Sequence, residues 1–258
     1  MSRERSITSR SNPQWQRLRR LAQQPAAYRQ QGEVWVEGEH LCAEVVQRGL
    51  VVPLAVVSDA AWDDPGLRRL AETADDVLRL PAPLMAGLTS LDSPPPIAFV
   101  LPWAPGAAPR PGMAAVVLDR LQDAGNVGSV LRSAAAFGIG QVIALKGTAA
   151  LWSPKVLRAG MGAHWALHLV ETAGEGELAA LGLPLVATSS HAPAAIGDLA
   201  LPWPCAWLLG HEGRGVAPGL LARCDLTCRI PQPGGMESLN VAAAAAVCLY
   251  EAARQRGG

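Results

Sequence analysis

The sequence of 258 residues has few aromatic residues, little charge and no long hydrophobic run. Aromatic residues make up 5% and charged residues 17%, whereas half of the residues are hydrophobic, a balance that excludes a wholly disordered chain. The 21 prolines and 26 glycines follow no fixed period, which excludes collagen-like and low-complexity chains. No stretch approaches the roughly 18 uncharged apolar residues of a membrane helix. We therefore expect a globular protein of one large or two small domains, without a membrane partner.

Cysteine is also scarce, and the five cysteines are scattered along the chain at Cys42, Cys205, Cys224, Cys228 and Cys248. An odd number on a chain too long to need disulfides predicts reduced thiols. Cys224 and Cys228 have no second Cys or His pair nearby, so we predict no metal site. The first twenty residues are basic but contain no apolar core, unlike a secretory signal. We expect a cytoplasmic protein.

Lysine occurs only at Lys146 and Lys155, so arginine supplies nearly all of the positive charge. The formal net charge is zero, yet residues 1–31 hold seven arginines and a single acidic residue, a charge of +6 against −6 for the remainder. Arginines interleaved with Trp15 and Tyr28 fit phosphate contact plus stacking on a base or sugar; a solvated terminal helix is the alternative. The candidate nucleic-acid contacts are Arg10, Arg17, Arg19 and Arg20.

The segment 102–112, PWAPGAAPRPG, is too rich in Pro, Gly and Ala to form a helix or a central strand. We interpret it as a linker between two domains. The predicted parts are a basic N-terminal arm at 1–32, a small α/β domain at 33–101, the linker at 102–112 and a larger domain at 113–258. In the α/β domain we predict strands at 34–38, 53–59 and 97–101 and helices at 38–46 and 65–74.

The larger domain contains repeated apolar runs of strand length, separated by helical or turn-rich stretches. They lie at 114–118, 141–145, 184–188, 205–209 and 226–230. Strands that are continuously apolar and alternate with helices predict a mostly parallel sheet covered on both faces. Ligands of such sheets bind beyond the carboxyl ends of the strands, and three conspicuous loops fall at these ends.

The first loop lies in the sequence LDRLQDAGNVGSVLRSAAAFGIG, which starts at Leu118. Asn126 is a good N-cap for the helix that we predict to follow. Arg132 lies off the apolar face of that helix, one turn beyond Gly128, so its guanidinium can pass over a residue without a side chain and reach the helix N-terminus. An arginine beside free backbone N–H groups makes an anion site; an exposed helical arginine is the alternative.

The second loop, in WLLGHEGRGV, places Gly210, Gly213 and Gly215 directly after a buried strand, with Glu212 among them. Glycines at these positions allow close approach of the backbone. The spacing is not GxGxxG and neither lysine stands in a Walker motif, which disfavours dinucleotide and P-loop sites. Alone, this loop is a weak indication of a ligand, and His211 fits a loop histidine better than a base.

The third loop follows a strand that ends at Ile230, where the run PQPGG forces an irregular path. Ser238 is the predicted cap of the next helix, whose alanine run supplies helix propensity but little bulk. Another backbone can therefore pack close to this helix. Ser238 and Asn240 then flank the mouth of the loop as neutral polar groups, although a plain capped helix is the alternative.

Together the three loops resemble the signature motifs of the SpoU/TrmH family of S-adenosylmethionine-dependent RNA 2′-O-ribose methyltransferases. The matching residues are Asn126, Gly128 and Arg132, then Gly210, Glu212 and Gly215, then Ile230, Pro231, Gly234, Ser238, Leu239 and Asn240. The resemblance covers residues 113–256; the first domain is more loosely similar to the family's ribosomal-protein-like substrate-binding domain. The sequence departs from the family pattern at two positions. Gln232 stands where the family usually has Met, and Ala124 follows Asp123 where the family often has Pro.

The resemblance implies a trefoil-knotted, SPOUT-type α/β domain that dimerises through its knot. It also implies S-adenosylmethionine in a cleft between the second and third motifs, with RNA as substrate: ribosomal RNA is preferred and transfer RNA is second. The implied cofactor-binding residues are Leu209, Gly210, Ile230, Pro231, Gly234 and Leu239. The implied catalytic residues are Asn126, Arg132, Glu212, Ser238 and Asn240, with Arg132 also an RNA contact.

The family arginine is often described as a general base, but a guanidinium stays protonated at neutral pH. We instead expect Arg132 to bind a neighbouring phosphate and to stabilise the developing alkoxide. Ser238 and Asn240 would orient the attacking oxygen, and Glu212 would fix the loop or an arginine. The competing hypotheses are an RNA-binding protein without catalysis, a base methyltransferase of the same knotted superfamily and a dinucleotide-dependent enzyme.

Overall fold

The computed structural model describes residues 3–236 and 238–257, and the chain divides into two compact units. The first unit is Met1–Pro105 together with Trp152–Gly162, and the second is Gly106–Leu151 together with Ala163–Gly258. The first boundary therefore lies inside the segment interpreted as a linker. The short segment 152–162, from the middle of the second half of the chain, belongs to the first unit.

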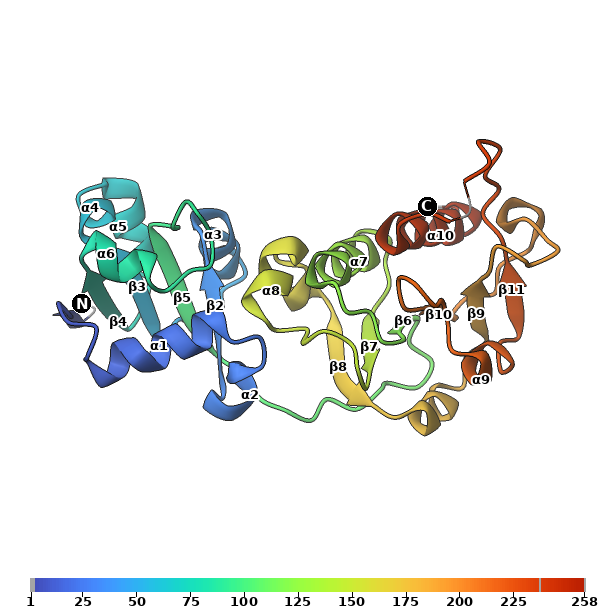
Figure 1. Ribbon diagram of the computed structural model, residues 1–258, viewed down its shortest axis with the longest axis horizontal. Helices are drawn as coiled ribbons and strands as arrows, with labels where there is room; N and C mark the ends of the chain where they lie inside the picture. Colours follow the sequence, from blue (N-terminus) through green and yellow to red (C-terminus); the bar gives the residue numbers. More distant parts are fainter. Residues whose placement is uncertain (1–2, 237, 258) are drawn as a thin grey trace. The chain divides into compact units, whose positions relative to one another are not determined.

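The first unit is built on a five-stranded mixed sheet of order β1-β4-β3-β5-β2 (Figure 1). Its strands are β1 (Arg3–Ser6), β2 (Glu33–Glu37), β3 (Leu54–Ser58), β4 (Asp76–Leu80) and β5 (Ile97–Pro102). Its helices are α1 (Pro13–Gln23), α2 (Ala27–Gln31), α3 (Glu39–Gln47), α4 (Asp59–Trp62), α5 (Pro65–Ala71), α6 (Ala82–Ala86) and α8 (Pro154–Gly160). Helix α8 packs against β2, where Arg158 forms an ion pair with the buried Glu37. The first unit is α/β, as predicted for its sequence.

The arginine-rich N-terminal segment is folded into this unit. Strand β1 pairs with β4, and α1 buries Trp15, Leu18 and Leu21. The Trp15 indole N–H donates to the carbonyl of Leu84 at 3.1 Å, and Tyr28 is only 2% exposed. The prediction that the Trp15 and Tyr28 rings stack on nucleic acid is therefore wrong, because burying large aromatic side chains stabilises the unit more than leaving them in water.

The second unit contains a six-stranded, wholly parallel sheet of order β11-β9-β10-β6-β7-β8. Its strands are β6 (Ala115–Leu118), β7 (Gln141–Leu145), β8 (His168–Ala173), β9 (Leu185–Thr188), β10 (Ala206–Leu209) and β11 (Leu226–Cys228). The predicted parallel α/β sheet is thus confirmed. Strand β8 was not predicted because His168, Glu171 and Thr172 interrupt its apolar pattern.

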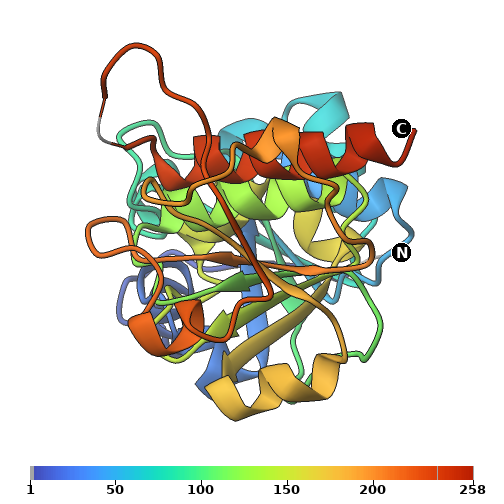
Figure 2. The ribbon, with the colours of Figure 1, turned by 90° about the vertical axis from the view of Figure 1, so that its right-hand side faces the viewer.

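Helices cover both faces of this sheet. Helices α7 (Ala124–Ala136) and α10 (Val241–Gln255) pack together on one face, and η2 (Glu175–Leu181) and α9 (Pro218–Leu221) lie on the other (Figure 2). The remaining short helices are η1 (Ala163–Ala166) and η3 (Ile196–Asp198). Because all strands run parallel, the ends that follow Leu118, Leu209 and Cys228 meet at one edge of the sheet.

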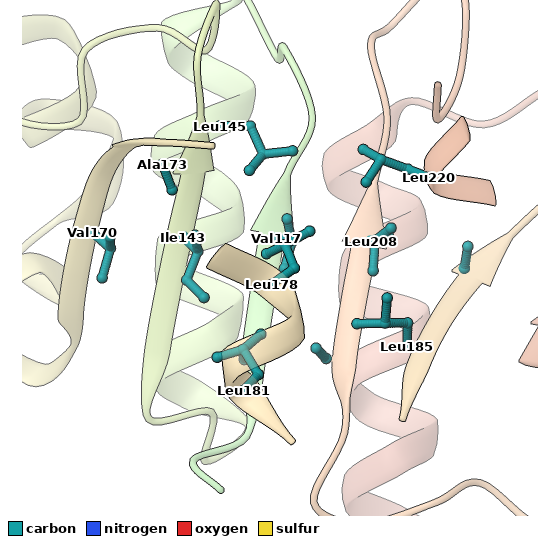
Figure 3. Packing of buried hydrophobic residues seen from close by; sticks show 13 residues of the cluster. Val117, Ile143, Leu145, Val170, Ala173, Leu178, Leu181, Leu185, Leu208 and Leu220 are labelled. Atoms are coloured by element: carbon teal, nitrogen blue, oxygen red, sulfur yellow. The ribbon is translucent and has the colours of Figure 1, made fainter. Parts of the chain in front are cut away.

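The face under η2 and α9 is held by a cluster of thirteen buried residues (Figure 3). On β6, Ala115 and Val117 belong to this cluster, whereas Val116 and Leu118 alternate with them and are equally buried. Each fully buried Val, Leu or Ile side chain contributes roughly 1.5–3 kcal/mol relative to an exposed one. Burial on both faces explains why these strands are continuously apolar.

Within the described ranges, no helix is long and apolar enough to cross a membrane. The same residues contain no group of three or more His, Cys, Asp or Glu side chains placed to hold a metal ion. All five cysteines are free thiols.

Candidate active site

The helix of the first motif begins earlier than the sequence predicts. Helix α7 starts at Ala124, and its N-cap is Asp123, whose carboxylate accepts a hydrogen bond from the Asn126 backbone N–H at 2.8 Å. The prediction that Asn126 is the cap is wrong, because Asp123 lies three residues earlier and takes the N–H that a cap accepts. The side chain of Asn126 is therefore free to bind elsewhere.

The helix of the third motif begins later than predicted. Helix α10 starts at Val241 with Asn240 as its N-cap, and the Asn240 Oδ1 atom accepts hydrogen bonds from the N–H groups of Ala242 and Ala243 at 2.9 and 3.3 Å. Ser238, the predicted cap, is exposed and makes no hydrogen bond with any described residue. Asn and Ser are equally good caps, so their local preference could not decide between them.

A chain of side-chain hydrogen bonds joins the three motifs. Because the Asn240 oxygen is used by the helix cap, its Nδ2 donates to the Asn126 Oδ1 at 3.0 Å. The Asn126 Nδ2 in turn donates to the Glu212 Oε1 at 3.3 Å. Each amide has its oxygen and nitrogen fixed by its partners. Three predicted catalytic residues, from segments up to 114 residues apart, therefore lie together.

Glu212 connects the second motif to the backbone of the first. Its Oε1 accepts the N–H of Asp123 at 3.1 Å, and its Oε2 accepts the N–H of Gln122 at 3.3 Å. Partial burial raises the pKa of the Glu212 carboxyl, but hydrogen bonds from its own backbone, Asp123 and Asn126 lower it, and the balance keeps the pKa below its usual value. A carboxylate held in this way is ionised and suits a structural anchor better than a proton acceptor.

The depressed pKa sets the pH dependence of this anchor. The hydrogen bonds of the Glu212 carboxylate contribute fully to stability above the ordinary glutamate pKa. This contribution is lost as the pH falls through the lower pKa that Glu212 has in the folded protein. At neutral pH, Glu212 therefore holds the two motif loops together.

The second motif forms a tight loop over residues 210–216. The N–H of His211 donates to the carbonyl of Gly215 at 3.0 Å, and the N–H of Gly215 donates back to His211 at 2.8 Å. A Cβ atom on Gly210 would lie 2.0 Å from both the Gly215 carbonyl carbon and the Val216 nitrogen. Only glycine fits at position 210, because backbone atoms occupy the space of a side chain.

Arg132 lies on the exposed side of α7, and its guanidinium makes no hydrogen bond or ion pair with any described residue. Gly128, one turn earlier, is buried in the same helix. The cationic group is therefore available to a ligand.

The residues that the resemblance assigns to the cofactor present unused backbone groups. No described residue makes a hydrogen bond with the N–H or C=O group of Gly210, Ile230 or Leu239. The side-chain oxygen of Gln232 is buried and also lacks a partner in the described ranges. Unpaired donors and acceptors at the ends of β10 and β11 fit S-adenosylmethionine, which carries both kinds of group. Of the other assigned residues, Leu209 is buried, and Pro231 and Gly234 are exposed.

The four arginines predicted to bind nucleic acid belong to the first unit and differ in availability. Arg17 forms an ion pair with Glu33, and Arg19 lies over the Trp15 ring at 5.6 Å. Arg10 and Arg20 are exposed, and their guanidinium groups have no partner among the residues that the structure describes.

Sequence reasoning missed Asp119, which immediately follows β6. The signal was present, because Asp119 is an acidic residue at the carboxyl end of an apolar run, where ligand loops begin. It is 2% exposed, and its carboxylate accepts the N–H of Ala217, directly after the second-motif loop.

The corrected cap assignments predict different effects for two exposed polar residues. We expect Asn240→Ala to lower the free energy of unfolding by about 1 kcal/mol or more, because α10 loses its cap and Asn126 loses a donor. Thermal or urea unfolding measures the change. Ser238→Ala is the matched control and should leave stability unchanged; equal losses for both variants would contradict the assignment.

Comparison with known proteins agrees with the architecture and the motifs. A parallel α/β domain with these three loops is typical of S-adenosylmethionine-dependent RNA 2′-O-methyltransferases. Residues 113–250 match the model of the SpoU rRNA methylase family, and the chain belongs to this family. Membership of this family establishes the enzyme class and the cofactor. The protein is an RNA 2′-O-methyltransferase that uses S-adenosylmethionine.

Relatives match nearly the whole chain. An uncharacterised tRNA/rRNA methyltransferase of Synechocystis is 32% identical over 97% of this chain and 94% of its own length. The Bacillus subtilis 23S rRNA (guanosine(2553)-2′-O)-methyltransferase RlmP is 31% identical over 83% of this chain and 86% of its own. The solved structure of the SpoU methyltransferase AviRb from Streptomyces viridochromogenes with AdoMet has a TM-score of 0.85 at 27% identity, covering 96% of this chain and 99% of that one.

Proposed function

We propose that this protein methylates a ribose 2′-hydroxyl of ribosomal RNA. The observation that carries the proposal is the hydrogen-bond chain from Asn240 through Asn126 to Glu212, which unites the three family motifs at one edge of the sheet. Ribosomal RNA is the substrate in the names of RlmP and several other relatives. Transfer RNA is the second candidate, because the Synechocystis relative is described as a tRNA/rRNA methyltransferase.

Bound S-adenosylmethionine supplies an electrophilic methyl group on a sulfonium. The backbone groups of Gly210, Ile230 and Leu239 would hold the cofactor, with Leu209, Pro231 and Gly234 lining the same loops. Transfer requires the ribose oxygen in line with the methyl carbon, so positioning is the main task of the protein. Glu212 performs part of it by fixing the second-motif loop against the first motif.

Arg132 would bind the phosphate next to the target nucleotide and stabilise negative charge as the 2′-oxygen loses its proton to water. An exposed guanidinium without an internal partner suits this role, since its donors are free for the RNA. Ser238 and Asn240 would orient the attacking oxygen, and Asn126 would fix the amide of Asn240. Arg10, Arg17, Arg19 and Arg20 would contact the RNA from the first unit.

Tritiated S-adenosylmethionine and total bacterial RNA that lacks its own ribose methylations test the substrate class. We expect label in the ribosomal RNA bands of a denaturing gel. Label confined to transfer RNA would contradict the ribosomal proposal, and label in no RNA, whether free or in ribosomal particles, would contradict both.

We also propose that the second unit is knotted, as the family resemblance implies, and forms a homodimer. Support for the dimer comes from apolar side chains left on the outer face of α10 and the loop before it. The exposed fractions are 40% for Val247, 55% for Tyr250, 42% for Leu239 and 71% for Met236. Exposed apolar side chains on this helix and the loop before it fit burial against a second copy.

Replacement of Val247 by glutamate tests the dimer. We expect Val247→Glu to convert a dimer to a monomer in sedimentation or light-scattering measurements, because a carboxylate would be buried without a partner. Val51→Glu is the matched control: Val51 is 70% exposed and lies in the first unit. A wild-type monomer, or a Val247→Glu dimer of unchanged affinity, would contradict this interface.

A further inference from the structure

Asp119 is a buried carboxylate without a role in the mechanism above. It directly follows β6 at the carboxyl edge of the sheet, and its side chain is 3% exposed. Burying an ionised group is costly unless charge and hydrogen bonds compensate it. The partners of Asp119 therefore indicate what the residue does.

Those partners lie at both ends of the second-motif loop. The backbone N–H of Asp119 donates to the carbonyl of Leu209 at 2.8 Å, just before the loop. Its Oδ2 accepts the N–H of Ala217 at 2.8 Å, just after the loop. Asp119 thus contacts the entry of the segment 210–216 through its backbone and the exit through its carboxylate.

Arg120 forms an ion pair with this carboxylate. Its Nε and Nη2 atoms donate to the two oxygens of Asp119 at 2.7 and 2.9 Å. Arg120 adopts a left-handed backbone conformation with φ of 59°, which is unfavourable for a residue with a side chain. Its backbone N–H is fixed by the hydroxyl of Thr148 at 3.2 Å. The surrounding structure therefore stabilises a strained conformation that presents this cation to Asp119.

Packing alone does not fix Asp119. Its side chain borders a cavity of about 240 Å³, whose wall includes Leu145 and Ala173 from the buried cluster in Figure 3. Burial raises the pKa of Asp119, but the hydrogen bonds from Arg120 and Ala217 lower it, and the balance keeps the pKa below its usual value. The carboxylate is thus ionised, and directional bonds determine its position.

We propose that Asp119 is a positioning residue that clamps the cofactor loop by accepting the Ala217 N–H. The inference rests on the proposed role of residues 210–216 in binding S-adenosylmethionine. Glu212 fixes the middle of this loop, and Asp119 fixes its ends. Without the Asp119 carboxylate, Ala217 would be released, and the neighbouring Gly215 carbonyl, which accepts the N–H of His211 next to Gly210, would be held less firmly.

Three variants separate the clamp from the ion pair. Asp119→Ala removes the acceptor, whereas Asp119→Asn keeps an oxygen for Ala217. Arg120→Gly removes the ion pair and the strain but leaves the bond between Asp119 and Ala217. We expect the Kd for S-adenosylhomocysteine, measured by calorimetry, to rise at least tenfold in Asp119→Ala and to stay within about threefold in the other two. The KM for S-adenosylmethionine should rise with it, while kcat changes less.

Amide hydrogen exchange of the unliganded protein gives a second readout. Residues 210–217 should exchange faster in Asp119→Ala than in the wild type or in Arg120→Gly. A folded Asp119→Ala protein with unchanged exchange and unchanged Kd would overturn the clamp. Equal weakening by Arg120→Gly would assign the effect to the ion pair and also overturn it. Failure of the wild type to bind S-adenosylhomocysteine would instead contradict the proposed cofactor loop, and the exchange measurement would still test the clamp.

Discussion

Replacement of Arg132 by alanine is expected to lower the rate of methyl transfer by roughly 10²–10³-fold, the loss typical of removing one donor that stabilises a developing oxyanion. Because the Arg132 side chain is exposed and has no partner among the described residues, the fold and the motif network should be unaffected. The Kd for S-adenosylhomocysteine should therefore stay at the wild-type value. Single-turnover rates with saturating RNA measure the effect.

Arg132→Lys distinguishes a planar donor from a simple positive charge. Lysine keeps the charge but cannot make two parallel hydrogen bonds to phosphate and alkoxide, so we expect most of the loss to remain. Arg223→Ala is the control: Arg223 is also exposed but precedes β11, at the opposite edge of the sheet. Near-normal turnover of Arg132→Lys would contradict the proposed role.

Gly210→Ala is expected to abolish measurable binding of S-adenosylhomocysteine. The added methyl group would lie 2.0 Å from backbone atoms of Gly215 and Val216, so the loop must open. Opening it breaks the hydrogen bonds between His211 and Gly215 and moves the backbone that we propose to hold the cofactor. Overpacking of this kind also costs about 1–3 kcal/mol of stability.

Gly213→Ala provides the matched control in the same loop. A Cβ atom at Gly213 would have its nearest neighbour, a ring atom of His211, at 3.9 Å, an ordinary contact distance. Calorimetry and thermal unfolding of both variants should separate them clearly. Wild-type affinity in a folded Gly210→Ala protein would contradict the account of this loop.

Much of the second unit could be predicted from the sequence because its strands are buried on both faces. The apolar runs located five of the six strands, and their common direction placed three polar loops at one edge. The unpredicted strand, β8, is the one whose sequence mixes polar and apolar residues. The local pattern of apolar residues thus identified each strand whose two faces are both buried.

The contacts within the site could not be predicted in the same way. Asn126 was expected to cap a helix, but Asp123 takes that role and leaves the Asn126 amide to join Asn240 and Glu212. Two or three good capping residues within one turn are equivalent locally, and only the tertiary fold selects among them. The clamp by Asp119 depends on Ala217, which lies 98 residues away in the chain.

Burial of the N-terminal segment also could not be predicted from local sequence patterns. Trp15 and Tyr28 stand among arginines in the sequence, which is typical of a nucleic-acid contact, yet the fold buries both rings. Similarly, nothing in the sequence of segment 152–162 indicates that it belongs to the first unit. Such choices depend on which surfaces remain uncovered once the sheets have formed.

We propose that the three motifs act together to methylate a ribose oxygen. The most direct test of this proposal is to label susceptible RNA with methyl-tritiated S-adenosylmethionine, digest the RNA to nucleosides and identify the labelled product by chromatography. We expect label only on a 2′-O-methylnucleoside, and roughly 10²–10³-fold less of it with Arg132→Ala over the same reaction time. Label on a base would contradict it.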